Sequence, residues 1–488
     1  MAKQYDYDIG IIGGGAAGLT TASGAARLGA KTLLIEKEKA LGGDCLHFGC
    51  VPSKTLINSA RAYHTIVNAG KHGLPDVDAP PVDFAGIRKR IENVISTIQE
   101  HDSEERFCGL GAKVEFGNPE FVDEHAVSLN GNTVSAKKWL IATGSSPGAP
   151  PVPGLEAAGY ITNREIFSLE KLPASMAIIG GGPIAMEMGQ AFSRMGTQVT
   201  IIEHADQILG REDKDLANEL LALLAASPNM TFHLNAKILS AKDLGRKKEV
   251  VFENANGDKK QVHAETLLVA AGRSPNIEGL ALEKAGVDFT GRGVQVDARM
   301  RTSQHHIFAA GDVTGSFLFT HAAGYEGSIV IANAVFRLPR KADYTFLPWC
   351  TYTDPELASI GMNEKSAKQA GISYTVWSEA FKDNDRSLAM GNTAGKIKMI
   401  LDEKENLMGV QILGPNAGDL INEWVAVAAG RVKLSTLASA VHPYPTLGEI
   451  NKRVAGAYLT PKIFSERIKK GLKFFFALKG RACGKDGE

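Results

Sequence analysis

Two segments far apart in the chain repeat one pattern, and this repeat constrains the fold more strongly than any other feature. The first, YDIGIIGGGAAG, is followed by a helix of small residues and then by KTLLIEK. The second, MAIIGGGPIAMEMG, is followed by QAFSRMG and then by QVTIIEH. Each copy predicts a strand, a glycine turn, a helix and a second strand that ends in an acidic residue. This is the βαβ unit that binds dinucleotides, so we expect an α/β fold with two Rossmann-like domains.

The first copy has the spacing of a complete dinucleotide-binding motif. Gly13, Gly15 and Gly18 follow an apolar strand and open an Ala-rich helix. These glycines allow the tight turn, the approach of the backbone to a pyrophosphate and the packing of the helix on the strand, and the helix N-terminus favours the phosphates. Glu36, eighteen residues after Gly18, can accept hydrogen bonds from an adenosine ribose. A glycine-rich loop without a ligand is the disfavoured alternative.

The second copy predicts an NAD site. Gly180 and Gly182 take the first two glycine positions, and Ala185 takes the third. Pro183 falls in the first turn of the helix, where proline is tolerated. Glu203 ends the second strand, and a carboxylate there accepts from a free 2′-hydroxyl and repels a 2′-phosphate, which favours NAD over NADP.

Three further apolar strands complete a map of the chain. WLIATG and LLVAAG end in glycine, and IFAAGDV places Asp312 where a carboxylate suits a ribityl hydroxyl of a flavin. After Asp343, shorter alternating stretches such as KIKMIL and LMGVQILG indicate a separate α+β domain. The predicted parts are an FAD-binding domain, an inserted NAD-binding domain, the α+β domain and a C-terminal tail, comprising residues 1–150 with 276–343, 151–275, 344–460 and 461–488. The other expected cofactor contacts are Gly43, Lys54, Gly117, Thr143, Gly144 and Thr320 for FAD, and Ile184 and Gly272 for NAD.

Composition narrows the class of protein. The 488 residues carry 54 acidic and 54 basic side chains, so the overall charge gives no reason to expect nucleic acid. No apolar run approaches the length of a membrane span, and the N-terminus lacks the pattern of a signal peptide. Five cysteines do not make a secreted disulfide scaffold. We therefore expect a cytoplasmic protein, in which a close pair of cysteines suggests catalysis.

The segment GGDCLHFGCVPSK contains such a pair, Cys45 and Cys50. Five positions on an ideal helix rise about 7.5 Å, beyond the limit of about 7 Å between the Cα atoms of a disulfide. The two cysteines can therefore bond only if the turn is distorted, which Gly42, Gly43 and Gly49 allow. A metal site would need further ligands at matching spacing, and no second cysteine pair is present. A redox disulfide is the favoured interpretation, over a buried thiol pair or a metal site, and no metal is expected.

With its motifs in this order, the chain from about residue 5 to about residue 460 resembles the flavin-dependent pyridine nucleotide–disulfide oxidoreductases. The resemblance implies that Cys45 exchanges with the substrate and that Cys50 lies against the flavin. It implies that Lys54 pairs with Glu187 beside the flavin. Electrons would pass between NADH, FAD, the cysteine pair and an external thiol or disulfide, for which a lipoyl group is one candidate. It also implies a homodimer, with the α+β domain as the dimerisation domain.

At one catalytic position, this chain differs from the lipoamide and glutathione enzymes of the family. In its lipoamide and glutathione enzymes, a C-terminal histidine stands before a proline and five positions before a glutamate, and acts as acid and base for the exchanging thiol. In AVHPYPTLGEI, Glu449 matches the glutamate, but Tyr444 takes the place of the histidine, as in mercuric reductase, and His442 is two residues too early. A phenol titrates near pH 10, at about three units above neutrality, so Tyr444 is a poor general base.

Several roles for this segment stay open. Tyr444 could donate a hydrogen bond to a thiolate, help to position a metal-bound thiol or serve only the turn, and His442 could reach the site if the loop were rearranged. By the resemblance, Tyr444 and Glu449 would complete the disulfide site of the partner subunit. Pro183 stands where some relatives carry an aromatic residue over the flavin, so the access of nicotinamide is expected to differ.

Two alternatives to a dithiol/disulfide enzyme are a metal-ion reductase of the mercuric type and a slow redox-sensing or electron-transfer flavoprotein. Mercuric reductases carry a vicinal cysteine pair near the C-terminus, whereas Cys483 stands alone here. Cys108 and Cys350 fall in unrelated stretches. Specific delivery of mercury is therefore doubtful.

The C-terminal tail, KIFSERIKKGLKFFFALKGR, is basic with interleaved apolar residues. Such a tail more often packs on its own domain with its lysines in water. Contact with an anionic membrane surface or with a partner protein is the alternative.

Overall fold

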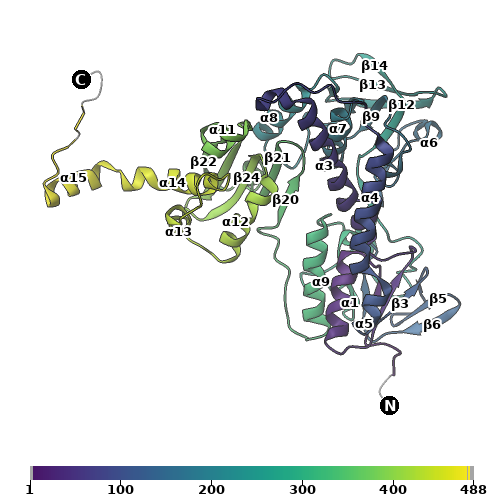
Figure 1. Ribbon diagram of the computed structural model, residues 1–488. Coiled ribbons are helices and arrows are strands. Elements are labelled where there is room, and N and C mark those ends of the chain that lie inside the picture. The colour runs from purple at the N-terminus through teal and green to yellow at the C-terminus, as the bar shows by residue number, and fades with distance from the viewer. Residues whose placement is uncertain (1–3, 481, 484–488) are drawn as a thin grey trace. The chain divides into compact units, whose positions relative to one another are not determined.

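The computed structural model describes residues 4–480, 482 and 483, which divide into two compact units (Figure 1). The first unit contains the described residues up to 211 together with residues 221–344. The second contains residues 212–220 together with the described residues from 345 onward. Among the described residues, no helix combines the length and the hydropathy that a membrane span requires.

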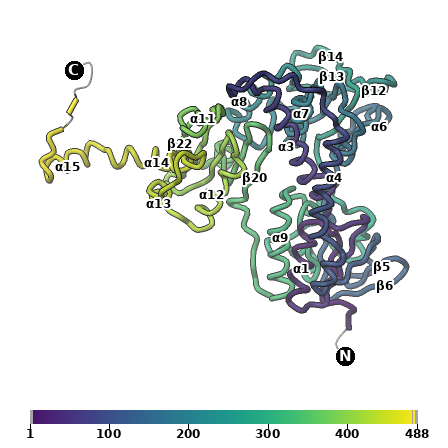
Figure 2. Tube along the Cα trace, viewed as in Figure 1, coloured from purple at the N-terminus to yellow at the C-terminus, as the bar shows by residue number. Residues whose placement is uncertain are grey.

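The first unit contains a parallel five-stranded sheet in the order β19-β7-β1-β2-β3. Its strands are β1 (Ile9–Ile12), β2 (Thr32–Glu36), β3 (Ala112–Phe116), β7 (Trp139–Ile141) and β19 (Ile307–Ala309). Every residue of β1, β2, β7 and β19 is buried, as expected for parallel strands covered on both faces. Helices α1 (Ala16–Arg27) and α9 (Thr320–Ala334) lie side by side, as Figure 2 also shows. The chain thus returns to its first sheet after the second βαβ unit.

The second parallel sheet of this unit has four strands in the order β11-β10-β9-β15. Its strands are β9 (Ser175–Ile179), β10 (Gln198–Ile202), β11 (Met230–His233) and β15 (Thr266–Val269), and α7 (Pro183–Arg194) connects β9 to β10. The two sheets share one register: Ile12 pairs with Ile35 in the first, and Ile179 pairs with Ile202 in the second. Each pairing brings a glycine turn beside the acidic residue that follows, so both βαβ units fold as the repeat predicts.

Smaller elements complete the first unit. Three antiparallel groups are formed by β4 (Glu120–Phe121), β5 (Ala126–Leu129) and β6 (Asn132–Ser135); by β12 (Lys237–Asp243), β13 (Lys248–Glu253) and β14 (Lys259–Ala264); and by β8 (Ser145–Pro147) with β16 (Arg273–Pro275). A short pair joins β17 (Phe289–Thr290) and β18 (Gly293–Val294). The other helices are α2 (Gly43–His47), α3 (Cys50–Val67), α4 (Phe84–Gln99), α5 (Glu104–Gly109) and α6 (Leu155–Ala158).

The second unit is built on an antiparallel sheet in the order β20-β21-β24-β23-β22. Its strands are β20 (Pro348–Thr351), β21 (Glu356–Gly361), β22 (Tyr374–Ala380), β23 (Lys396–Asp402) and β24 (Leu407–Gly414). Its helices are α10 (Glu364–Gln369), α11 (Asp385–Met390), α12 (Ala417–Ala429), α13 (Leu434–Ser439), α14 (Glu449–Ile463) and α15 (Glu466–Phe476). Trp424 of α12 and Val454 of α14 are fully buried in one core with Met399 of β23. The fold class is therefore α/β with two Rossmann-like domains and a C-terminal α+β domain, as the sequence predicts.

The other face of this sheet carries a polar row that the segment 212–220 covers. Cross-strand pairing aligns Trp349, Ser359, Gln411 and Lys398 on four neighbouring strands. Glu212 accepts from Trp349 Nε1 at 2.5 Å, from Ser359 Oγ at 2.7 Å and from Gln411 Nε2 at 2.8 Å. Burial raises the pKa of Glu212 above its usual range. Side chains along β23 and β24 therefore point alternately into an apolar core and into a buried polar row. The second face of the sheet is thus covered here, although an alternating pattern usually indicates a face open to solvent.

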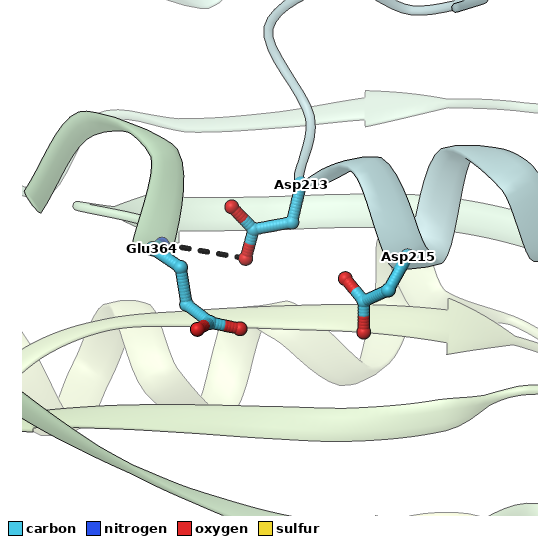
Figure 3. Close-up of side chains that lie close together, drawn as sticks. All are labelled: Asp213, Asp215 and Glu364. Atoms are coloured by element: carbon cyan, nitrogen blue, oxygen red, sulfur yellow. Dashed lines mark hydrogen bonds between the residues drawn. The ribbon is translucent and has the colours of Figure 1, made fainter. Parts of the chain in front are cut away.

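Asp213, Asp215 and Glu364 form an acidic cluster, with the two aspartates at the start of α8 (Lys214–Ala225) (Figure 3). Lys398 contacts all three carboxylates. Its Nζ lies 2.9 Å from Asp213 and from Asp215, and 2.5 Å from Glu364. Burial alone would lower the pKa of Lys398, but the hydrogen bonds that its ammonium group donates to these carboxylates outweigh it and raise the pKa well above the usual range. The ammonium group thus occupies the centre of the three carboxylates, and the cluster gives no reason to infer a metal.

Candidate redox site

The first glycine loop is fixed in a conformation that only glycine permits. Gly13 has a φ of 110°, and a Cβ there would lie 2.2 Å from the carbonyl oxygen of Ala142. A Cβ on Gly18 would lie 1.9 Å from the carbonyl oxygen of Gly13, so α1 packs directly on the turn. Glu36 is buried, and its carboxylate accepts from the backbone N–H of Gly14 at 2.6 Å. The loop, the helix N-terminus and the carboxylate are thus held together at the carboxyl end of β1.

The second loop repeats this arrangement at the start of α7. Gly180 has a φ of 115°, and Pro183 is the first residue of the helix. Glu203 is buried and accepts from the backbone N–H of Ala205 at 2.7 Å, while its carboxylate also lies 2.7 Å from Nδ1 of His204. No basic cluster that would bind a 2′-phosphate follows this carboxylate in the sequence.

The residues at these loops fit two dinucleotides. At Gly144, Gly182 and Gly272, an added Cβ would meet no atom within 4 Å, so the backbone faces open space. These glycines follow β7, β9 and β15, at the strand ends where α/β sheets bind ligands. A side chain at these positions would fill the space that a pyrophosphate or ring must enter.

A polar network lies next to the first loop. The sequence predicts a role for Asp312 but not for the other members of this network. Asp312 accepts from Ser145 Oγ at 2.6 Å, and Arg273 donates to Ser145 at 2.7 Å and to Asp44 at 2.9 Å. Burial raises the pKa of Asp312. The buried Oδ1 of Asp44 has no hydrogen-bond partner among the described residues. The only signal for Arg273 is its place directly after the glycine of LLVAAG, because its partners come from distant segments.

The cysteine segment is broken between its two cysteines, as the spacing argument requires. Helix α2 ends at His47, and α3 begins at Cys50. Between them Gly49 has a φ of −124° and a ψ of −115°, far from helical values. Gly43 has a φ of 61°, and a Cβ there would lie 2.8 Å from Cα of Gly15, so this segment packs on the first glycine loop. Both Cys45 and Cys50 are free cysteines in the structure.

The two thiols are chemically unequal. A hydrogen bond from Cys45 lowers the pKa of Cys50 to about 6, with smaller contributions from Thr320 and Lys54. The same hydrogen bond, together with burial, raises the pKa of Cys45 above its usual range. Cys50 is also the first residue of α3, and the N-terminal end of a helix favours a thiolate. The pair therefore holds one thiolate, on Cys50, and one thiol, on Cys45.

Two further contacts surround this pair. Thr320, the first residue of α9, places Oγ1 3.4 Å from Sγ of Cys50, so a residue expected at FAD lies against the cysteine. Nζ of Lys54, one helical turn after Cys50, lies 2.8 Å from Oε2 of Glu187. Glu187 lies on α7, so this ion pair joins the cysteine helix to the helix of the second glycine loop.

The remaining expected cofactor contacts occupy loop and helix-start positions. Thr143 Oγ1 donates to the carbonyl oxygen of Asn276 at 2.7 Å, and the N–H of Gly117 donates to the carbonyl oxygen of Glu36 at 2.9 Å. Ile184 is half-buried at the start of α7. All three residues lie in the first unit: Gly117 and Thr143 follow the carboxyl ends of β3 and β7, and Ile184 lies in the first turn of α7.

The C-terminal residues lie in the second unit and form separate contacts. Tyr444 is 70% exposed and donates to Asp385 at 2.7 Å, which raises the pKa of the phenol further. Nε2 of His442 lies 2.9 Å from Oε1 of Glu423, and Glu449 is the first residue of α14. Tyr444 therefore stays protonated at neutral pH, whereas His442 is engaged with a carboxylate of its own.

Comparison with known families accounts for most of the chain. Residues 7–327 match the model of the family described as pyridine nucleotide-disulphide oxidoreductase. Residues 347–455 match the model of the dimerisation domain of the same family. The first match begins at the first βαβ unit, and the second ends within the first half of α14.

Curated relatives and solved structures agree with these matches. Mitochondrial dihydrolipoyl dehydrogenase of Schizosaccharomyces pombe is 34% identical over 460 residues, covering 92% of this chain and 89% of the relative. Mercuric reductase of Bacillus cereus is 33% identical over 448 residues, covering 91% of this chain and 70% of the relative. The HOCl-induced flavoprotein disulfide reductase RclA of Escherichia coli is similar in structure, with a TM-score of 0.82, 28% identity, and coverage of 92% of this chain and 99% of the other.

Proposed function

Because the chain belongs to the pyridine nucleotide-disulphide oxidoreductase family, whose members use FAD and NAD(P), we propose that it passes electrons from NADH to an external disulfide through Cys45 and Cys50. The observation that carries this proposal is the unequal cysteine pair. Cys50 has a pKa of about 6 at the start of α3, and Cys45 donates a hydrogen bond to it. A structural thiol pair would not need this difference in proton affinity.

The chain's own residues account for the thiol chemistry. FAD, when bound, supplies the relay of an electron pair between nicotinamide and the cysteines. Cys45, once it has lost its proton, attacks one sulfur of the substrate disulfide, and the other sulfur leaves as a thiolate that takes up a proton. The Cys50 thiolate then attacks Sγ of Cys45 and releases the second substrate sulfur as a thiolate, which takes up a proton from water. This step closes the Cys45–Cys50 disulfide, so one substrate disulfide is reduced as one enzyme dithiol is oxidised.

The Lys54–Glu187 pair has a positioning role in this proposal. The ammonium group is held 2.8 Å from a buried carboxylate, one helical turn from Cys50, and it contributes to the low pKa of Cys50. A cation at this point also favours negative charge on a reduced flavin ring. The pair would thus place one positive charge where it stabilises both the Cys50 thiolate and a reduced flavin.

We further propose that NADH is preferred over NADPH. Glu203 stands at the end of the second βαβ unit, where it can accept from a ribose 2′-hydroxyl and repels a 2′-phosphate. The buried carboxylate is held by the N–H of Ala205, so it cannot easily turn away from a bound nucleotide.

The identity of residue 444 helps to decide which compound accepts the electrons and in which direction the reaction runs. By family resemblance, this residue faces the cysteine pair of the partner subunit in a homodimer, where lipoamide enzymes use histidine as a base. Tyr444 has a raised pKa because it donates to Asp385, so it cannot remove a proton from dihydrolipoamide near pH 7. We therefore propose that the enzyme runs from NADH toward a disulfide, with Tyr444 as a hydrogen-bond donor and not as a base.

A metal-ion reductase is the second candidate function. The solved relative RclA is also described as a Cu(II) complex, and mercuric reductase is among the curated relatives. A thiolate beside a thiol is a suitable donor pair for a soft metal ion. Cys483, however, is a single exposed cysteine and offers no vicinal pair for delivery of the ion.

An anaerobic assay of the FAD-loaded protein separates these functions. NADH oxidation is followed with lipoamide, with small and protein-borne disulfides, and with mercuric or cupric ion in excess thiol, in the natural protein and in Tyr444→His and Tyr444→Phe. We expect turnover with a disulfide, little NAD reduction by dihydrolipoamide, and a gain in that reaction of about a hundredfold in Tyr444→His, the scale of general-base catalysis. Rapid NAD reduction by dihydrolipoamide in Tyr444→Phe would overturn the proposed direction, and turnover only with a metal ion would favour the second candidate.

A further inference from the structure

Helix α15 leaves its whole surface in contact with solvent. None of the residues Glu466–Phe476 is buried. Phe474, Phe475 and Phe476 are 82%, 78% and 70% exposed, among the most exposed large apolar side chains in the described part of the protein. The expectation that the tail packs on its own domain holds for Lys462, which contacts Glu405 and Tyr458, but not for α15, in which no described residue is buried.

The exposed side chains are sorted onto two sides of the helix. One side has the spacing of an amphipathic helix, with apolar residues at positions i, i+4, i+7 and i+8. These residues are Ile468, Leu472, Phe475 and Phe476. The charged residues occupy the rest of the circumference: Lys470, Lys473 and Arg467 lie away from the apolar side, with Phe474 among them, and Lys469 lies at the edge of the apolar side next to Phe476. Glu466 is the single acidic residue of the helix and pairs with Lys469 at 2.8 Å, so the helix keeps a clear excess of positive charge.

The family's dimerisation domain does not explain this exposed face. Its model ends at residue 455, within α14, and α15 begins at Glu466. The structural match to the solved relative RclA includes 99% of RclA but only 92% of this chain, so part of this chain has no counterpart in RclA. The exposed face of α15 lies outside the shared dimerisation domain, so we expect it to bind something other than the partner subunit's dimerisation domain.

We propose that α15 binds the surface of a bilayer that contains anionic phospholipids. Its apolar side would enter the boundary between headgroups and acyl chains, and its lysines and arginine would lie at the level of the phosphates. The pattern fits a lipid surface better than a protein groove, because aromatic residues cluster at one end while most cations lie away from the apolar side. The helix is too short and too charged to cross the bilayer, so the protein would lie on the membrane as a peripheral enzyme.

Vesicle sedimentation tests this proposal with the full-length, FAD-loaded protein. The vesicles consist of phosphatidylcholine alone, or of equal parts of phosphatidylcholine and phosphatidylglycerol. The charge variant is Lys469→Glu/Lys470→Glu/Lys473→Glu, and the apolar variant is Phe475→Ser/Phe476→Ser. The control for charge reverses three exposed lysines elsewhere, Lys247→Glu/Lys259→Glu/Lys260→Glu, and the control for apolar loss replaces two exposed apolar residues after α9, Phe336→Ser/Leu338→Ser.

We expect the natural protein to sediment with the anionic vesicles and to be released by high salt. Each basic residue near an anionic surface changes partitioning by about fivefold, so the charge variant should bind about a hundredfold more weakly. The apolar variant should lose at least about tenfold, and both controls should bind as the natural protein does. The proposal is overturned if the protein ignores anionic vesicles or if the tail variants bind as well as the controls. It is equally overturned if sedimentation velocity shows that α15 mediates self-association while no vesicle binding occurs, because a second copy of the chain would then be the occupant.

Discussion

Nζ of Lys54 and Oε2 of Glu187 lie 2.8 Å apart and join helix α3, which begins with Cys50, to helix α7, which follows the second glycine loop. The carboxylate is buried, whereas the lysine side chain is 36% exposed. The two residues are 133 positions apart in the chain, so the contact depends on the fold of the whole first unit. It links the position of the cysteine pair to that of the helix that follows the second glycine loop.

Replacing Lys54 with methionine should destabilise the protein by about 1–3 kcal/mol, because it removes a cation that lies 2.8 Å from the buried carboxylate of Glu187. The cost stays below that of a fully buried pair because water still reaches the lysine. Lys113→Met, which breaks a surface pair with Glu115 at 3.3 Å, is the matched control and should leave the stability nearly unchanged, because exposed ion pairs contribute little. Urea unfolding of both variants measures the difference, and equal losses would contradict the role given to the buried carboxylate.

The alkylation of Cys50 should depend on pH around 6. Because the pKa of Cys50 is lowered to about 6, the thiolate predominates above that pH, and its reaction with iodoacetamide should reach half its limiting rate near it. By linkage, the thiolate's contribution to stability is present above the thiol's unfolded pKa and is lost as the pH falls through about 6. Cys45→Ala removes the donor and should move the alkylation profile toward the ordinary thiol value of about 8.5.

Mass spectrometry of the peptide that contains Cys50 follows this reaction in the reduced protein. Cys350→Ser, which removes a cysteine of the second unit, should leave the profile unchanged. A profile that is the same in Cys45→Ala as in the natural protein would show that the hydrogen bond between the cysteines does not set the pKa.

Replacing Glu203 with glutamine should weaken the binding of NADH and leave the binding of NADPH unchanged. Loss of the charged acceptor for the ribose 2′-hydroxyl should lower the affinity for NADH by about ten- to a hundredfold, as for other hydrogen bonds to charged groups. Removal of the carboxylate also relieves its repulsion of a 2′-phosphate. Calorimetric titrations with both nucleotides provide the comparison, with Glu36→Gln as the control that should affect FAD and not NADH. Equal loss of both nucleotides in Glu203→Gln would refute the assignment.

Two lysines on β23 should differ strongly in their effect on stability. Lys398 is 3% exposed and contacts three carboxylates, so Lys398→Met should cost about 3–5 kcal/mol. Lys396, two positions earlier, is 30% exposed, and Lys396→Met should cost less than about 1 kcal/mol. The raised pKa of Lys398 adds a pH dependence: its contribution is complete below the unfolded pKa and is lost only as the pH rises through the higher folded value. Unfolding curves at neutral and alkaline pH check both statements, and similar losses in the two variants would contradict them.

The sequence predicts the parts of this protein that depend on local spacing. The two glycine turns, the acidic strand ends and the break between Cys45 and Cys50 all follow from residues close together in the chain. The polar network of Arg273 does not, because its partners Asp44 and Ser145 are 229 and 128 positions away.

The placement of residues 212–220 shows the same limit. This segment lies within the range assigned to the NAD-binding domain, yet it packs with the second unit. Glu212 reads in the sequence as a surface carboxylate and becomes buried only because Ser359 and Gln411 pair across β21 and β24. Charged residues of this kind reveal their partners only once the tertiary fold is known.

Anaerobic titration with dithionite tests the central claim, that Cys45 and Cys50 form a redox centre in contact with bound FAD. The oxidised, FAD-loaded protein should take up one equivalent of reductant for the flavin and a second for the disulfide, and a long-wavelength absorption band should appear between them. Cys50→Ser should take up only the flavin's equivalent and show no such band. If the natural protein takes up a single equivalent and resembles Cys50→Ser throughout, the cysteine pair is not a redox centre and the proposed function is wrong.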